Sequence, residues 1–204
     1  MKLLYSNILP LRTEEDQETI MDCFTEQMKM ADRVEIAVGY TSNASLAELD
    51  WLVDECHISK VCLNIGMYFI EGMPEGAYHT AIKINEKWQE AGIGEIRIVK
   101  AFKYHGKLFC FDKDGKPFSA IIGSANLGVI KFAASNRRQY EMSAITTDEQ
   151  EVAEIAKHIE KLKMPNCSEN IALVENMPLV LNLLHPFRNR MLIFTKGARH
   201  MYPF

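Results

Sequence analysis

The chain of 204 residues is 48% hydrophobic and 25% charged, which is the composition of a globular domain that builds its own core. Its N-terminus lacks the apolar run of a signal peptide, and no window approaches the roughly 20 apolar residues of a membrane span. Five cysteines without a CxxC pair argue against a disulfide framework and a zinc cluster. We therefore expect a cytoplasmic protein that does not enter the membrane.

The formal net charge of −4 is divided unevenly along the chain. Residues 1–99 hold 8 Lys/Arg against 17 Asp/Glu, whereas residues 100–145 hold 8 Lys/Arg against 3 Asp/Glu. A local basic region attracts a polyanion even on an acidic protein. The segment 100–145 is therefore where we expect an anionic substrate to bind.

The first elements predicted are a helix over 13–31, which Thr13 and the acids after it would begin, and a strand over 34–40. Helices and strands then alternate, which predicts a layered α/β domain with a mostly parallel or mixed sheet. The later elements expected before and after the central motif are helices over 44–55, 77–92 and 147–163 and strands over 61–65, 96–99 and 139–147.

Residues 66–74 form the one loop that invites a functional interpretation. They directly follow a predicted strand end, where open α/β sheets gather their ligands. Two glycines with aromatic and Met residues suggest a loop at the cleft, although Met67 and Phe69 are expected to pack on the sheet edge.

Two apolar runs in the basic segment each include a pair of polar residues, and we expect the two pairs to lie close together. His105 and Lys107 are two residues apart on the first run, and Ser124 and Asn126 are two apart on the second, so each pair shares a face of its strand. A lysine suits a phosphate that a histidine attacks or protonates, and hydroxyl and amide groups complete a nest for a tetrahedral oxyanion. Gly123 allows close approach by a ligand. The alternative is an exposed hairpin without chemistry.

Joined in order, these residues resemble the HKD signature of the phospholipase D superfamily. The positions that match its HxK, Asp and GSxN groups are His105, Lys107, Asp112, Gly123, Ser124 and Asn126. Glu141 resembles the acid that the family places after GSxN. The segment between Asp112 and Gly123 is longer than usual, and its turn residues indicate a longer hairpin loop. The resemblance implies a three-layer α/β/α sandwich around a mixed, mostly parallel central sheet.

The resemblance also implies a mechanism without a metal or cofactor. Superfamily members need two signature sets, and one set per chain implies a homodimer with a composite site. His105 of one subunit would form a phosphohistidine, and His105 of the other would protonate the leaving oxygen. The supporting roles implied are charge stabilisation by Lys107, Ser124 and Asn126, orientation of the imidazole by Glu141, and structural support near the site by Asp112 and Gly123. We also expect Lys103, Arg137 and Arg138 to contact phosphates.

The position of the motif and the GMYFIEG loop resemble the catalytic domain of BfiI/NgoFVII-type restriction endonucleases. The leading hypothesis is therefore a metal-independent DNA endonuclease. Residues 1–165 would form the catalytic domain, and residues 166–204 an extension that packs on the core or leads to a DNA-recognition domain. Recognition of DNA could come from such a domain or from a separate subunit. The alternatives are a phospholipid or small phosphodiester hydrolase and a catalytically silent dimerisation module.

Overall fold

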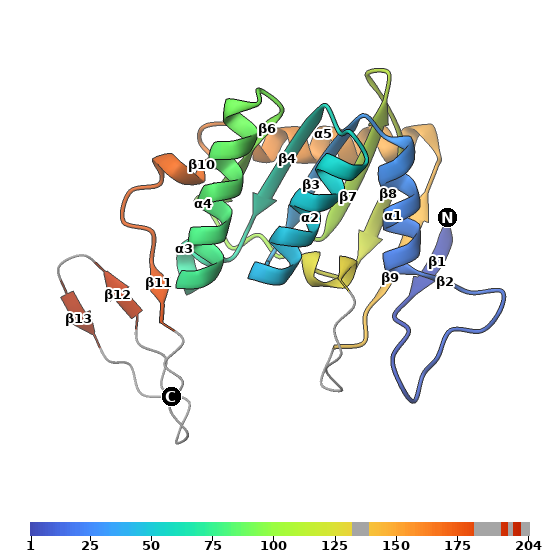
Figure 1. Cartoon of the computed structure of the whole chain (residues 1–204), viewed down its shortest axis with the longest axis horizontal. Helices are drawn as coiled ribbons and strands as arrows, with labels where there is room; N and C mark the ends of the chain where they lie inside the picture. The colour runs from blue at the N-terminus through green and yellow to red at the C-terminus, as the bar shows by residue number, and fades with distance from the viewer. Residues whose placement is uncertain (132–138, 182–192, 196–197, 201–204) are drawn as a thin grey trace.

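The computed structural model describes residues 1–131, 139–181, 193–195 and 198–200 (Figure 1). Within them the main sheet has nine strands, which lie in the spatial order β10 (Ser168–Asn170), β6 (Gly94–Val99), β4 (Lys60–Ile65), β3 (Arg33–Val38), β7 (Leu108–Lys113), β8 (Lys116–Gly123), β9 (Met142–Thr146), β1 (Lys2–Tyr5) and β2 (Glu18–Thr19). A second, smaller sheet consists of β13 (Ala198–His200), β12 (Ile193–Thr195), β11 (Leu179–Val180) and β5 (Met73–Pro74).

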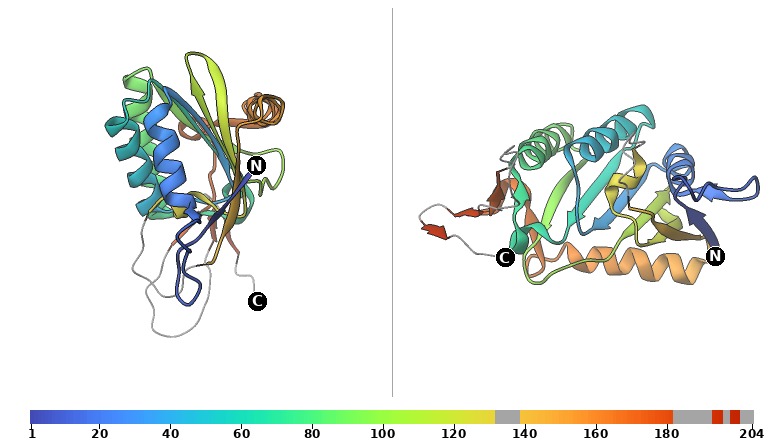
Figure 2. Two further views of the ribbon diagram at one scale, coloured as in Figure 1. Left: turned by 90° about the vertical axis from the view of Figure 1, so that its right-hand side faces the viewer. Right: turned by 90° about the horizontal axis from the view of Figure 1, so that it is seen from below.

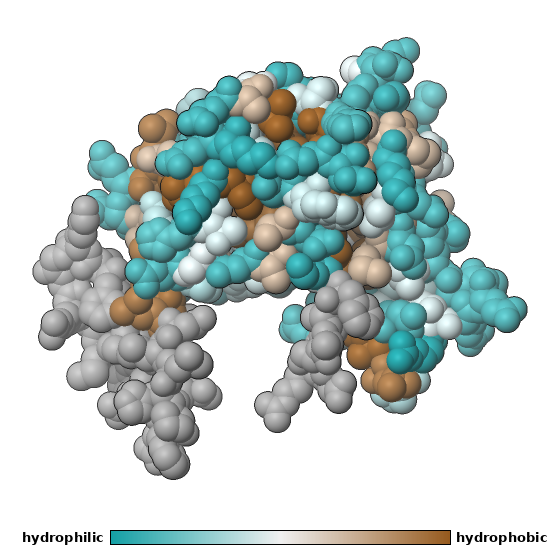
Figure 3. Space-filling view, viewed as in Figure 1, coloured by the Kyte–Doolittle hydropathy of each residue, from teal (hydrophilic) through white to brown (hydrophobic). Residues whose placement is uncertain are grey.

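Helices cover both faces of the main sheet, which confirms the predicted three-layer α/β/α fold. One face packs against α1 (Ile20–Met30), α2 (Asn43–Glu55) and α4 (Glu75–Glu90), and the other face packs against α5 (Glu149–Leu162) (Figure 2). The short helical turns are α3 (Tyr68–Glu71), η1 (Leu127–Ile130) and η2 (Ile171–Leu173). The outer surface of the layer formed by α1, α2 and α4 is mainly hydrophilic (Figure 3). Among the described residues, no helix is both long and apolar enough to cross a membrane.

The sheet is mixed, but the expectation that it is mostly parallel is wrong. Strands β3, β4 and β6 are parallel to one another, whereas β7, β8, β9 and β1 follow as consecutive antiparallel neighbours of β3. The reason is the short turn between β7 and β8, at which Asp114 and Gly115 have positive φ. A connection this short joins antiparallel strands, because a parallel pair needs a long crossover.

Alternating side chains of β7 divide between the two cores. Phe109 and Phe111 meet Phe24 of α1 edge-to-face, each at a ring-centroid distance of 5.5 Å. Cys110 points the other way and packs in the core beneath α5. The strand is therefore buried on both faces, and its position relative to the helices is fixed by the large aromatic side chains.

Helix α1 begins later than predicted. Its N-cap is Thr19, whose hydroxyl accepts a hydrogen bond from the Asp22 N–H at 3.0 Å. Thr13 and Thr19 are each followed three residues later by an Asp, so both offer the same local capping pattern. The later start prevails because the apolar face begins at Ile20 and residues 18–19 pair with β1.

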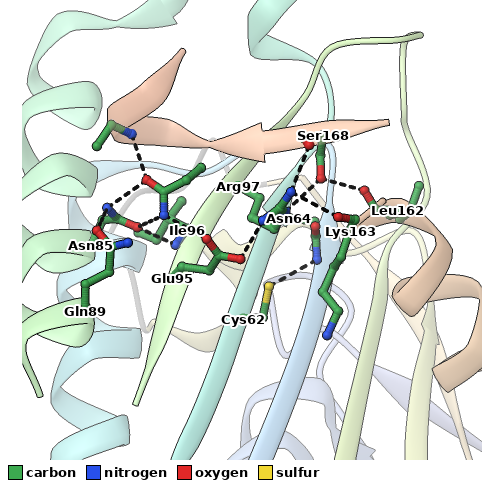
Figure 4. Close-up of polar contacts among 12 residues, drawn as sticks. Cys62, Asn64, Asn85, Gln89, Glu95, Ile96, Arg97, Leu162, Lys163 and Ser168 are labelled. Carbon is green, nitrogen blue, oxygen red and sulfur yellow. Dashed lines mark hydrogen bonds and ion pairs between the residues drawn. The ribbon is translucent and has the colours of Figure 1, made fainter. Parts of the chain in front are cut away.

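The main sheet continues beyond residue 165, where the domain boundary was predicted. Strand β10 pairs antiparallel with β6 and is held there by Arg97, as Figure 4 shows. The Arg97 guanidinium donates to the Ser168 carbonyl at 2.8 Å and to the Lys163 carbonyl at 3.0 Å, and it pairs with Glu95 at 2.6 Å. The first residues of the expected extension are therefore part of the sheet itself.

Candidate active site

The HxK and GSxN residues meet at one end of the central strands β3, β7 and β8. In the antiparallel pair β3–β7, Ala37 lies opposite Leu108, so the segment before β7 runs beside the segment after β3. This segment carries His105 and Lys107, which lie just before the strand rather than within it. Ser124 directly follows β8, whose Ile122 pairs with Leu108. The HxK and GSxN groups therefore come together as the sequence predicted.

Asn126 links the GSxN segment to the end of β3. Its Oδ1 accepts hydrogen bonds from the backbone N–H of Gly39 at 3.1 Å and of Tyr40 at 3.0 Å. A Cβ atom added at Gly39 would lie 3.0 Å from His105 Cδ2 and 3.4 Å from Asn126 Oδ1, so the imidazole and the amide border the same small space. Because Oδ1 is committed to these two donors, the Nδ2 group is the part of the amide that can donate to an anion.

Lys107 brings a nearly buried positive charge to the site. The residue is only 7% exposed, and its ammonium donates to the His105 carbonyl at 2.6 Å. Burial lowers the pKa of Lys107, while the charge of Glu141 acts in the opposite direction. A buried ammonium is stabilised by an anion that replaces the lost water. Its position beside His105 is therefore suited to a phosphate group.

Glu141 is bound to Ser124 instead of His105. The Ser124 hydroxyl donates to the Glu141 carboxylate, and the Met142 N–H donates to the same hydroxyl oxygen at 3.1 Å. Within the part of the chain that the structure describes, no hydrogen bond joins Glu141 to the imidazole, so its predicted orienting role has no direct contact here. Glu141 lies one residue before β9, and the pairing of β8 with β9 brings it beside Ser124.

Gly123 lies at a point of close approach, and the neighbour that approaches it is β9. A Cβ atom at this position would lie 2.4 Å from Ser143 Oγ and 2.5 Å from the Met142 carbonyl oxygen. Real Cβ atoms do not approach other atoms so closely, so a larger residue would push β8 away from β9. The glycine thus allows Ser124 to follow the strand at the required distance.

Asp112 does not lie near the site, which corrects our expectation. It lies opposite Arg33 at the other end of β7, about 14 Å along the strand from Leu108 at the usual rise of about 3.4 Å per residue. Its carboxylate is 3.7 Å from the Arg33 Nε, and burial raises the pKa of Asp112. Its observed ion-pair contact is with Arg33, at the far end of the strand and away from the site.

The basic segment is less positive in the structure than in the sequence. Lys103, which we expected to contact phosphate, lies 3.2 Å from Glu71. Other lysines of this segment also pair with acids from elsewhere in the chain, namely Lys100 with Glu169, Lys113 with Asp32 and Lys131 with Glu48. Arg137 and Arg138 lie outside the described residues. The sum of charges along the sequence could not include these partners.

Sequence reasoning missed two side chains beside His105. The Tyr40 ring meets the imidazole edge-to-face at a centroid distance of 5.9 Å, and the Tyr40 hydroxyl donates to Glu71. Glu71 belongs to the 66–74 loop, which does border the site as predicted. Tyr40 is the last residue of the strand predicted over 34–40, so its position at a strand end was the available signal.

Comparisons with known proteins agree with this geometry. The model of a family described as the NgoFVII restriction endonuclease N-terminal PLD domain matches residues 18–176, while curated proteins give no match. Among solved structures, Nuc of Salmonella typhimurium, a phospholipase D family member, is similar with a TM-score of 0.52 and 12% identity, over 83% of this chain and 95% of that chain. The fold is thus phospholipase D-like. Because the family match extends over well more than half of its residues, the chain belongs to the family of NgoFVII restriction endonuclease PLD domains.

Proposed function

We propose that the protein is a metal-independent DNA endonuclease that acts through a phosphohistidine in a dimeric composite site. Membership of the family makes it an enzyme that hydrolyses phosphodiester bonds. The observation that carries the proposal is the nearly buried ammonium of Lys107, bound to the carbonyl of His105 and lying beside an imidazole and an amide. These are the groups that hold, attack and stabilise a phosphoryl centre.

The reaction would proceed in two displacements. In the first, His105 of one copy attacks phosphorus, a P–N bond forms, and the bond to the leaving oxygen breaks as His105 of a second copy gives that oxygen its proton. In the second, this second imidazole takes a proton from water, the water oxygen attacks phosphorus, and the P–N bond breaks. Lys107, Ser124 and Asn126 would stabilise the negative charge that builds up on the equatorial oxygens.

The positive charge of Lys107 supports a reaction without a metal. Among the described residues, no group of three or more His, Cys, Asp and Glu is placed to hold a metal ion. An ammonium at this position would supply the charge stabilisation that a metal ion supplies in other phosphodiesterases.

An exposed row of apolar side chains beside the site supports pairing with a second copy. Leu3 is 53% exposed, Ile122 41% and Met142 46%. Leu3 and Ile122 both pair with Ala144, and Met142 lies two residues before it, so the three share the face of the sheet that α5 covers further along. Ile122 lies opposite Leu108, three residues after His105, so a second copy placed on this row would lie near the site.

The same row supports the alternative function, a phospholipid or small phosphodiester hydrolase. Exposed apolar side chains beside a phosphoryl site are also what a lipid chain would contact. A polynucleotide would instead depend on the basic segment, whose lysines are largely paired with acids in this structure. The two functions therefore predict different preferred substrates.

The deciding experiment is cleavage of DNA in the presence of EDTA. We expect the wild-type protein to cleave DNA. The cleavage rate of His105→Ala should be lower by a factor of at least about 10³, because the nucleophile is absent. His79→Ala is the matched control, since His79 is an exposed histidine of α4 that pairs only weakly with Glu75 at 3.8 Å. The protein's mass in solution is measured alongside, and we expect a dimer.

Each part of the proposal has its own contradicting result. Loss of wild-type cleavage in EDTA would contradict metal independence, and an active His105→Ala would contradict the phosphohistidine. A strictly monomeric, fully active protein would contradict the composite site. Much faster cleavage of phospholipid or bis(p-nitrophenyl) phosphate than of DNA would favour the alternative function, whereas a chain without any hydrolytic activity would be a silent dimerisation module.

A further inference from the structure

Side chains from two other parts of the chain hold the loop that follows β3 at the point where it passes His105. Asn126 binds the N–H groups of Gly39 and Tyr40. One residue further on, the Tyr68 hydroxyl accepts from the Thr41 N–H at 3.0 Å and donates to the Thr41 carbonyl. The backbone of this loop is therefore fixed by side chains that come from two other parts of the chain. These bonds leave the backbone at Gly39, Tyr40 and Thr41 little freedom to move.

The loop holds the Tyr40 ring between two other aromatic rings. The ring meets His105 at 5.9 Å with an interplanar angle of 76° and Tyr68 at 5.6 Å with an angle of 69°. Edge-to-face contacts of this kind are attractive and depend on orientation. His105 itself is an exposed residue, so its imidazole would otherwise be free to change rotamer.

Glu71 completes the arrangement by binding the hydroxyl end of Tyr40. That hydrogen bond is the main cause of the lowered pKa of Glu71, and the charges of Lys103 and His105 act in the same direction. Burial and the same bond to Glu71 raise the pKa of Tyr40 to about 12, so the hydroxyl remains a donor at neutral pH. Glu71 thus stays ionised and keeps the Tyr40 ring in one orientation.

We propose that Tyr40 is a positioning residue, which holds the His105 imidazole in the orientation for in-line attack, and that Glu71 fixes Tyr40 in turn. This inference rests on the proposed function and adds two residues to it, which act through the His105 imidazole. The ring supplies the contact with the imidazole, and the hydroxyl supplies the attachment to Glu71. Loss of the ring should therefore be more harmful than loss of the hydroxyl.

The test compares Tyr40→Leu and Tyr40→Phe in the full chain by diester hydrolysis in EDTA. We expect Tyr40→Leu to lower kcat about 10²-fold with KM unchanged within about twofold, because a misplaced reacting group slows the reaction without weakening substrate binding. Tyr40→Phe keeps the ring and should lose only about threefold to tenfold. Tyr78→Leu is the matched control, since Tyr78 meets the exposed His79 at a similar centroid distance of 5.7 Å on α4.

The role of Glu71 is tested by combining variants. If Glu71 acts only through the Tyr40 hydroxyl, Glu71→Gln in the Tyr40→Phe background should lower kcat no further than about twofold. A full additional loss in the double variant would overturn the assignment of Glu71 as the group that fixes Tyr40. It would show that Glu71 acts on the site by another route.

The NMR signals of the His105 ring protons provide a readout that does not depend on activity. The Tyr40 ring current shifts these signals, so we expect Tyr40→Leu to move them and Tyr40→Phe and Tyr78→Leu to leave them nearly in place. Unmoved signals in a folded Tyr40→Leu, or a kcat within twofold of wild type, would overturn the proposal. If the wild-type protein hydrolysed no diester, the proposed function would fail, while the NMR shifts would still decide whether Tyr40 orients the imidazole.

Discussion

Both ends of the β3–β7 strand pair carry charged side chains, but these side chains have different kinds of partner at the two ends. At one end Arg33 lies opposite Asp112, and at the other Ala37 lies opposite Leu108, next to His105 and Lys107. At the first end, which we call the closed end, the charged side chains form ion pairs with one another. At the second, which we call the open end, the Lys107 ammonium donates to a backbone carbonyl.

The closed end is a network of ion pairs beneath and beside α5. Arg33 lies 2.7 Å from both Glu35 and Glu160, and Lys163 lies 3.1 Å from Glu35. Burial raises the pKa of Glu35, and the two cations act in the opposite direction. Two cations thus compensate the buried acids at this end, and no ligand is needed for the charge balance.

The open end has a charged group that is as buried as Asp112 but has a weaker partner. Lys107 is as buried as Asp112, each at 7% exposure, but its ammonium donates to a carbonyl instead of a carboxylate. The two residues of the proposed HKD signature therefore differ in their contacts. In our proposal Lys107 binds an anion, whereas Asp112 is part of the ion-pair network between β7 and β3.

The largest effect should come from Lys107→Met, which removes the charge at the open end. We expect the rate of diester hydrolysis to fall about 10³-fold, as when one oxyanion-stabilising donor is removed. The thermal unfolding midpoint should stay equal or rise, because a buried ammonium with a lowered pKa destabilises the folded state at neutral pH. Lys116→Met, at the exposed start of β8, is the control for both measurements.

The stability of Lys107→Met relative to wild type, and the pH dependence of wild-type stability, can each contradict this prediction. The folded state releases the Lys107 proton at a lower pH than the unfolded state, so wild-type stability from this group increases as the pH rises towards 10.5. A Lys107→Met protein that unfolds several degrees earlier than wild type at pH 7 would show that the ammonium is structural. The two ends of the strand pair would then not differ as we argue.

The next effect in size is expected at the closed end, from Arg33→Met. Glu35 and Asp112 would lose a cation while they remain buried, so we expect the free energy of unfolding to fall by about 3 kcal/mol at pH 7. kcat should change less than about threefold. Urea unfolding measures the first quantity, and Arg12→Met, an exposed arginine, should change it by less than about 0.5 kcal/mol.

The pH dependence of Arg33→Met follows from the two raised pKa values. A carboxyl whose folded pKa is raised gives stability that is present below its unfolded pKa, near pH 4, and is lost as the pH rises through the folded pKa. Removal of Arg33 raises these pKa values further. The deficit of the variant should therefore be smaller at pH 4.5 than at pH 7, and an equal deficit at both values would exclude the ionic explanation.

The sequence predicted the open end better than the closed end, and the reason lies in the kind of contact. The local spacing of His105, Lys107, Ser124 and Asn126 identifies them as one motif, although the structure places all four just outside the ends of β7 and β8. The sequence also predicted most helices and strands, since their apolar periodicity is strong. These signals are local, and local spacing is what a sequence displays.

Contacts between distant segments were not predictable in this way. Asn126 binds the backbone N–H groups of Gly39 and Tyr40, and every residue except proline offers such a donor. Asp112 carries the same spacing whether it lies near the site or at the far end of β7. Only the register of β7 against β3, which depends on packing of the aromatic core, decides between the two.

The smallest predicted effect concerns a hydroxyl that belongs to neither end. Tyr104 precedes His105, is 8% exposed, and its hydroxyl has no hydrogen-bond partner among the described residues. Tyr104→Phe should raise the free energy of unfolding by about 1 kcal/mol, because it removes a buried polar group that is unsatisfied. Tyr68→Phe removes a buried hydroxyl that is bonded to Thr41 and should lower it by a similar amount. Urea unfolding of both variants gives the two signs directly. If Tyr104→Phe were destabilising as well, the Tyr104 hydroxyl would have a stabilising partner. The polar contacts of the open end would then reach from His105 to Tyr104 in the core beneath α5.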